Sequence, residues 1–136
     1  MKVLFICRGN VGRSQWAEAF FNNYSKSHRA ISAGTEVSHN EGQTLEQYED
    51  VCKVMALEGI DIGHYERKQL TPDAVEDSDL VVAITEKTYC PDYLLQNLDV
   101  IYWDVPDAKG TDYETHVRIK DSIKGLVRKL VRELEP

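Results

Sequence analysis

Near its start the sequence contains the stretch Lys2-Val-Leu-Phe-Ile-Cys7-Arg-Gly-Asn-Val-Gly-Arg-Ser14. Residues 2–6 form a short run rich in residues that favour strands, and they are predicted to be a buried strand. Two glycines follow, and residues 14–27 then repeat apolar side chains at helical spacing. The stretch is therefore predicted to be a strand, a tight loop and the beginning of a helix.

The rest of the chain continues this alternation of strands and helices. Further strands are expected at residues 30–33, 79–85 and 99–102. Helices are expected at residues 43–58, after Thr71-Pro72, at 88–96 with an interruption at Pro91, and after a capping box at 111–114. Such alternation predicts an α/β fold with a parallel sheet covered by helices on both faces. We expect one domain, residues 1–136, with its ligand beyond the carboxyl ends of the strands.

Composition places the chain among ordinary globular proteins. Hydrophobic residues make up 42% and charged residues 29% of its 136 residues, which argues against a disordered or fibrous protein. The longest apolar run, residues 3–7, is far too short to span a membrane. Only Met1-Lys2 precede it, so no secretory signal is expected. The three cysteines are widely spaced, which favours reduced thiols and a cytoplasmic location.

The net charge of −7 is unevenly distributed. Residues 1–34 carry five basic side chains and one acidic side chain, whereas residues 35–136 carry 11 basic and 22 acidic ones. An acidic surface repels nucleic acid backbones, so no nucleic acid partner is expected, and none of the sequence suggests a membrane partner. The basic N-terminal region is where an anion would bind.

The loop after the first strand has the composition of an anion site. Backbone N–H groups of a glycine-containing loop can turn inward, and the following helix N-terminus adds partial positive charge. Cys7 at the mouth of such a loop would ionise readily and act as a nucleophile. The fork of Arg13 can hold two oxygens of a phosphate-like group. The predicted phosphate-binding residues are Arg8, Gly9, Asn10, Val11, Gly12, Arg13 and Ser14.

Other interpretations of this loop are weaker. A P-loop NTPase needs Gly-Lys-Ser/Thr, and a dinucleotide-binding loop needs a third glycine; this sequence has neither. The remaining alternative is a buried cysteine that closes a strand before an ordinary glycine turn.

The Cys-x5-Arg-Ser loop resembles that of the low-molecular-weight protein tyrosine phosphatase family, which includes the thioredoxin-coupled arsenate reductases. The similarity continues along the chain through Ser14–Ala19, Ser32–Thr35, Gly59–Ile62, Gln69–Thr71, Asp79–Val82 and Trp103–Asp107. The resemblance implies a three-layer domain with strand order 2-1-3-4. It also implies two-step phosphoryl transfer through a phosphocysteine at Cys7, with Arg13 stabilising the charge and with no metal or other cofactor.

The resemblance further implies a general acid in the loop after the last strand. Alignment places this acid at Asp107, with Ala108 where the family has proline, and Asp104 is the alternative. Asn10 and Ser32 are expected to hold the shape of the phosphate loop. His64 and Tyr65 lie near the family's loop-supporting histidine, but they are not included in the predicted site.

Departures from the family pattern leave three functions open. The first is hydrolysis of a phosphorylated protein or small aryl phosphate, with inorganic phosphate and other oxyanions as inhibitors. Gly12 replaces the loop's usual second cysteine, and Thr85 stands where a relay cysteine would fall, with only Cys90 near the second. Arsenate reduction would therefore need an external thiol, and it is the second function. The third is a non-hydrolytic phosphate-binding module or phosphoryl carrier.

One departure bears on the substrate. Ala108 and Lys109 occupy positions where related phosphatases carry aromatic residues that sandwich a phenol ring. Tyr89, Tyr93 and Trp103 are the aromatic side chains that could replace them.

Overall fold

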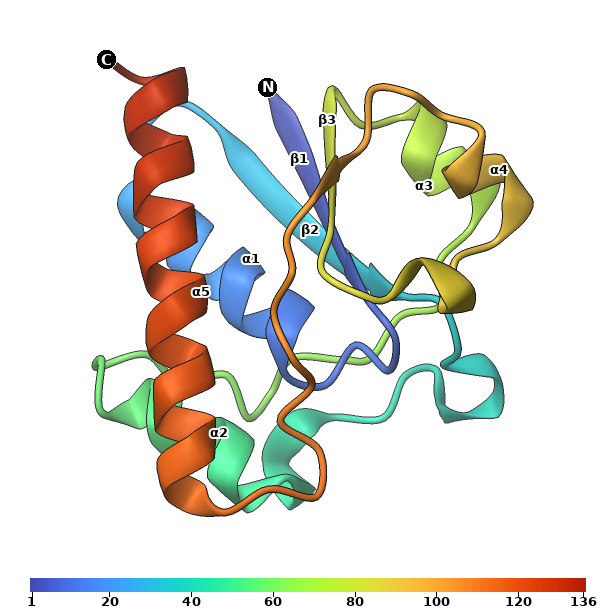
Figure 1. Ribbon diagram of the computed structural model, residues 1–136. Helices are drawn as coiled ribbons and strands as arrows, with labels where there is room; N and C mark the ends of the chain where they lie inside the picture. Colours follow the sequence, from blue (N-terminus) through green and yellow to red (C-terminus); the bar gives the residue numbers. More distant parts are fainter.

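The computed structural model describes residues 1–136, and its centre is a four-stranded sheet in which neighbouring strands are parallel (Figure 1). The strands are β1 (Lys2–Cys7), β2 (Arg29–Gly34), β3 (Leu80–Ala83) and β4 (Ile101–Tyr102). Their spatial order is β2-β1-β3-β4. The α/β fold, the parallel sheet and the order 2-1-3-4 are confirmed.

Helices cover both faces of the sheet (Figure 1). One face packs against α1 (Arg13–Tyr24), α2 (Glu49–Ala56) and α5 (Tyr113–Leu134), and the other against α3 (Pro72–Glu76) and α4 (Asp92–Leu95). Short 3₁₀ turns lie at Ser38–Asn40, Leu45–Gln47 and Lys87–Tyr89. No helix combines the length and apolar character that crossing a membrane requires.

The central strand β1 explains why both faces need a helical layer. Val3 and Phe5 pack into the larger core beneath α1 and α5, whereas Leu4 and Ile6 pack into a second core beneath α3 and α4. All four side chains are fully buried, as expected for a strand of a parallel sheet between two layers of helices. Cys7, the last residue of β1, pairs with Gly34, the last residue of β2, so Cys7 lies at the carboxyl edge of the sheet.

The helix predicted over residues 43–58 is wrong in its first half. The structure has the 3₁₀ turn Leu45–Gln47 there, and α2 begins only at Glu49. The reason is a competing tertiary pairing: the Arg67 backbone N–H donates to the Gln43 carbonyl at 2.9 Å. The backbone that would have opened the helix is therefore bonded to a distant part of the chain.

The start of α5 also differs from the predicted capping box. Asp112, not Thr111, is the N-cap residue, and its carboxylate accepts a hydrogen bond from the Thr115 N–H at 2.9 Å. This hydrogen bond holds the pKa of Asp112 below its usual value. The Thr111 hydroxyl donates instead to the Ala108 carbonyl at 2.6 Å, which ties the preceding loop to the helix.

Candidate active site

The loop between β1 and α1 lies directly against the end of β2. The Thr35 and Glu36 N–H groups donate to the carbonyls of Cys7 and Arg8 at 2.9 and 2.8 Å. A Cβ atom at Gly34 would lie 2.7 Å from the Arg8 oxygen, closer than Cβ contacts in real structures. Only glycine at position 34 therefore lets the loop approach this closely.

Asn10 fixes the loop from inside. It has a positive φ of 55° and is completely buried. Its amide nitrogen donates to the hydroxyls of Ser14 and Ser32 at 2.8 and 3.0 Å. Its amide oxygen accepts from Gln15 Nε2 at 3.0 Å and from the Lys68 N–H at 2.8 Å. Every hydrogen-bonding position of this buried amide is satisfied, as such groups require.

The hydrogen bonds of Asn10 determine which atom donates in the hydrogen bond between Ser14 and Cys7. The Ser14 hydroxyl accepts from Asn10, so its own proton is available to Cys7 Sγ, which lies 2.9 Å away. The Asn10 backbone N–H lies 3.3 Å from the same sulfur. The buried sulfur is thus surrounded by donors, which is the environment expected around a nucleophilic thiolate.

Behind Asn10, the network ends on the carboxyl group of Glu18, whose side chain is 15% exposed. The Ser32 hydroxyl accepts from Asn10 and donates to Glu18 Oε1 at 2.9 Å. Burial raises the pKa of Glu18, and the positive charge of Lys68, 3.9 Å away, opposes that shift only partly. Ser32 thus lies where the sequence placed it, beside the loop.

Arg13 enters the site from the first turn of α1 and is 2% exposed. Its Nη1 donates to the Val105 carbonyl at 3.0 Å and to Glu86 Oε1 at 3.2 Å. Neither Nε nor Nη2 makes a hydrogen bond within the chain, although Nη2 lies 3.6 Å from Asp107 Oδ2. The guanidinium is therefore held on one side, and its other N–H groups remain available for oxygens of a ligand.

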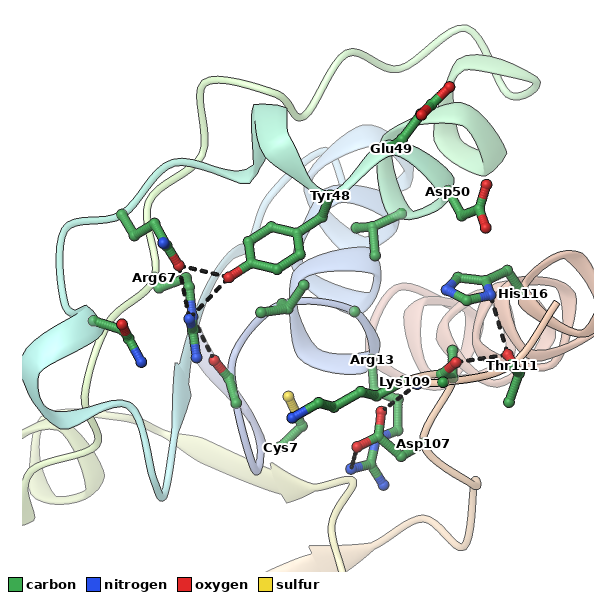
Figure 2. Close-up of a pocket in the computed structure, with 18 residues that line it drawn as sticks. Cys7, Arg13, Tyr48, Glu49, Asp50, Arg67, Asp107, Lys109, Thr111 and His116 are labelled. Atoms are coloured by element: carbon green, nitrogen blue, oxygen red, sulfur yellow. Dashed lines mark hydrogen bonds and ion pairs between the residues drawn. The ribbon is translucent and has the colours of Figure 1, made fainter. Parts of the chain in front are cut away.

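A cavity of about 560 Å³ opens beside these groups (Figure 2). Cys7, Arg13 and Asp107 all line it, and so do Gly9, Val11 and Gly12 of the loop. The structure thus brings the three predicted catalytic residues to one cavity. Asp104 does not line it, and its side chain is exposed.

Asp107 lies in the loop between β4 and α5 and is 47% exposed at its side chain. Its Oδ1 accepts a hydrogen bond from the Lys109 N–H at 3.0 Å, and its Oδ2 faces Arg13. Ala108, next in the chain, is buried, so the loop is anchored although the expected proline is absent. Figure 2 shows the Lys109 side chain extending from this loop toward Cys7.

Two predicted groups lie elsewhere. The Arg8 side chain pairs with Glu36 and stacks on the Tyr89 ring at 3.8 Å, and it does not line the cavity. Trp103 packs on Phe5 with 5.7 Å between ring centroids, so neither Tyr89 nor Trp103 forms a wall of the cavity. Tyr93 is likewise absent from the lining.

The remaining cysteines are also remote from the cavity. Cys52 and Cys90 are free thiols, and neither lines it. Burial raises the pKa of both thiols. No three His, Cys, Asp or Glu side chains converge in a way that could hold a metal ion.

Sequence reasoning missed one wall of the cavity, which is formed by Arg67, Gln43 and Tyr48. Arg67 Nε donates to the Gly9 carbonyl at 2.9 Å, and Nη1 donates to Gln43 Oε1 and to the Tyr48 hydroxyl at 2.8 and 3.0 Å. The Tyr48 hydroxyl donates to Gln43 at 2.6 Å. No spacing signal connects these residues, because the antiparallel contact between their two segments exists only in the folded chain.

His116 of α5 is the other lining residue that was missed. Its Nδ1 lies 2.9 Å from the Asp112 carbonyl and 3.1 Å from Thr111 Oγ1. The Thr111 proton is already donated to a carbonyl, so the ring proton is assigned to Nδ1. Figure 2 shows the other ring nitrogen, Nε2, on the side of the ring away from Thr111.

Comparison with known proteins gives a consistent result. A family model described as low molecular weight phosphotyrosine protein phosphatase matches residues 2–136. A crystal structure of a low-molecular-weight protein tyrosine phosphatase from T. tengcongensis superposes with a TM-score of 0.85 at 29% identity, covering 98% of this chain and 99% of that chain.

Arsenate reductases are similar as well. Arsenate reductase 1 of Staphylococcus epidermidis is 30% identical over 128 residues, which is 92% of this chain and 91% of that protein. The crystal structure of an arsenate reductase from Archaeoglobus fulgidus has a TM-score of 0.71 at 32% identity, covering 95% of this chain and 98% of that chain.

Proposed function

The chain belongs to the low-molecular-weight phosphotyrosine protein phosphatase family, and from this we propose that it hydrolyses phosphomonoesters through a phosphocysteine intermediate. We propose further that its substrate is a phosphorylated protein, with phosphotyrosine as the reacting group, and that it acts in the cytoplasm. One observation carries the proposal: Cys7, the unbonded N–H groups of Arg13 and the Asp107 carboxylate face the same cavity.

In the first step, the Cys7 thiolate attacks phosphorus while the bond from phosphorus to the ester oxygen breaks. The ester oxygen takes a proton from Asp107 and leaves as a phenol. The N–H groups of the loop and the Nε and Nη2 groups of Arg13 bind the phosphoryl oxygens as charge develops. The Ser14 hydroxyl supports the ionised sulfur before attack and again when it leaves.

In the second step, a water molecule attacks phosphorus on the side the phenol has left. Its proton passes to the Asp107 carboxylate, the bond between sulfur and phosphorus breaks, and inorganic phosphate and the thiolate are released. The same aspartate thus gives and recovers one proton per turnover. Positive charge at the phosphoryl group comes from Arg13 and the loop, and the proposed steps need no cofactor.

The cavity suits an aryl group although the predicted aromatic residues lie elsewhere. Val11, Tyr48 and Val51 provide apolar surface, and about 560 Å³ exceeds what a phosphoryl group alone would fill. Tyr48, rather than Tyr89, Tyr93 or Trp103, therefore provides the aromatic surface beside the phenol ring of the substrate.

The test is hydrolysis of 4-nitrophenyl phosphate in the presence of a metal chelator. The wild-type protein should turn it over, the Cys7→Ser variant should not, and a Cys90→Ser variant should behave as wild type, because Cys90 lies outside the cavity. Full activity in the Cys7→Ser protein would contradict the proposal. A phosphocysteine that forms but is not cleared by water would instead indicate a phosphoryl carrier.

Arsenate reduction with an external thiol is a second candidate function. It is favoured by the similarity to arsenate reductases and by the fact that Cys7 is the one cysteine lining the cavity. Arsenate would bind in the same loop and bond to Cys7. Two thiols from outside the chain would then be oxidised to one disulfide, which supplies the two electrons that reduce arsenate to arsenite and returns Cys7 as a thiolate. The test is arsenate-dependent oxidation of thioredoxin or a small thiol by a Cys52→Ser, Cys90→Ser double variant; no oxidation above background excludes this function.

A further inference from the structure

Arg67 is a buried cation that lacks a counter-charge in the chain. It is 8% exposed, and it lines the cavity from the loop between α2 and α3. Its three hydrogen-bond acceptors, the Gly9 carbonyl, the Gln43 amide and the Tyr48 hydroxyl, are all neutral. None of the salt bridges of the protein includes Arg67.

The contrast with Arg13 shows that this is unusual. Arg13, the other buried guanidinium at the cavity, lies 3.2 Å from one carboxylate, Glu86, and 3.6 Å from another, Asp107. Buried charges in proteins are normally paired, because an uncompensated charge away from water is costly. The missing partner of Arg67 is thus expected to be an anion that enters the cavity.

The guanidinium is also oriented before any ligand binds. Nε donates to the Gly9 carbonyl, and the two acceptors of Nη1, Gln43 Oε1 and the Tyr48 hydroxyl, are bonded to each other. Nη2 makes no hydrogen bond, and it lies 3.6 Å from the position a Cβ atom would take on Gly9, at the rim of the phosphate loop. A donor held in this way loses little conformational freedom when it binds an oxygen.

The cavity is asymmetric in charge around this group. Figure 2 shows Arg67 on one side of Tyr48, and Asp50 and His116 on the other. A ligand with two anionic groups would therefore place one at Cys7 and Arg13 and the other toward Arg67, away from Asp50.

We propose that Arg67 forms a second anion subsite, so that the preferred substrate is a phosphomonoester bearing another phosphate or carboxylate group near the reacting one. This proposal rests on the proposed function for the identity of the reacting group, but binding at the subsite does not require turnover. Arg67 also braces the Gly9 carbonyl, and the experiment separates these two roles.

The measurement is protection of Cys7 from alkylation by iodoacetate, with phosphate and pyrophosphate as competing ligands. Pyrophosphate should protect the wild-type protein at a concentration about tenfold lower than phosphate, the effect of one added charge-assisted hydrogen bond. Arg67→Gln should remove most of this preference and Arg67→Lys should retain part of it. The control Lys129→Gln, which removes an exposed charge on α5, should keep it in full.

An equal loss of affinity for phosphate and pyrophosphate in Arg67→Gln would contradict the anion subsite. It would show that Arg67 only supports the Gly9 carbonyl. A second comparison needs no variant: phosphonoacetate should protect the wild-type protein better than methylphosphonate, and equal protection would also overturn the proposal. Protection without hydrolysis of any phosphomonoester would contradict the proposed function alone. Hydrolysis without a preference for two anionic groups would contradict the subsite alone.

Discussion

The Asp107 carboxylate lies 3.6 Å from Nη2 of Arg13, and both side chains line the cavity that Cys7 also lines. The two side chains come from the loop after β4 and from the first turn of α1, which are about ninety residues apart in the chain but meet at the carboxyl edge of the sheet. The proposed general acid and the proposed phosphate-binding cation therefore face one cavity, although they are far apart in the sequence.

This pairing gives a prediction for the general acid. Asp107→Asn keeps the shape of the side chain but cannot protonate the leaving group, so kcat/KM for phenyl phosphate, which reports the first step, should fall by about 10²–10⁴-fold. The loss should be smaller for 4-nitrophenyl phosphate, whose leaving group needs less help. Asp104→Asn is the matched control and should be near wild type, since Asp104 is outside the cavity. The reverse pattern would transfer the role to Asp104.

Asn10 should be important for both stability and activity. Asn10→Ala removes four buried hydrogen bonds, and at about 1 kcal/mol each the free energy of unfolding should fall by about 2–4 kcal/mol. Activity should fall as well, because the loop and the Ser14 hydroxyl lose their support. Chemical denaturation and aryl phosphate hydrolysis measure the two effects. Asn23→Ala, at an exposed position of α1, should change neither by much; similar behaviour of the two variants would refute the role given to Asn10.

Gly34 tests the close approach of β2 to the phosphate loop. Its alanine variant would put a Cβ atom 2.7 Å from the Arg8 oxygen and 2.8 Å from the Asn10 nitrogen, so the loop must move. A displacement near 1 Å should lower kcat/KM by about 10²-fold. Gly125→Ala is the contrasting case: its Cβ would meet open space within α5, and the change should raise stability by about 1 kcal/mol. Unchanged kcat/KM in Gly34→Ala would show that the loop tolerates the shift.

The stability contributions of two partly buried carboxyl groups, Glu18 and Glu58, should change with pH in opposite directions. Burial raises the pKa of Glu18 above its ordinary 4.5, so the native state holds the proton more tightly than the unfolded chain. The stability advantage of wild type over Glu18→Gln should therefore decrease as pH rises from below 4.5 through the native pKa.

Glu58 should show the opposite trend. Hydrogen bonds from Lys120 and Lys124 lower its pKa below 4.5, so the stability it contributes is present above that pH and is lost as pH falls through its native pKa. The advantage of wild type over Glu58→Gln should therefore increase with pH. Denaturation curves between pH 3 and pH 7 measure both differences, and the same sign for both variants would contradict this account.

Much of the fold was predictable because its signals are local. The alternation of strands and helices indicated the sheet, and the proposed phosphate-binding loop is one continuous segment between β1 and α1. Cys7, Asn10, Arg13 and Ser14 could therefore be placed together from spacing alone. The rule that carboxyl ends of parallel strands share an edge indicated only the loop after β4. The choice of Asp107 over Asp104 within that loop came from the resemblance to the phosphatase family.

The other parts of the site depended on tertiary pairing. Residues 43–48 have a pattern compatible with a helix, but their pairing with residues 65–67 overrides it. That pairing brings Tyr48 and Arg67 to the cavity, and the packing of α5 on α1 brings His116 beside Trp16, with 6.2 Å between ring centroids. The local sequence pattern of a segment does not indicate which distant segment it will contact in the folded protein.

The most direct test of the central claim is to trap the covalent intermediate. An Asp107→Asn protein mixed with 4-nitrophenyl phosphate, quenched rapidly and digested should yield a peptide containing Cys7 that carries one phosphoryl group, detected by mass spectrometry. Release of nitrophenol without phosphorylation of Cys7, or with the label on another residue, would contradict the account.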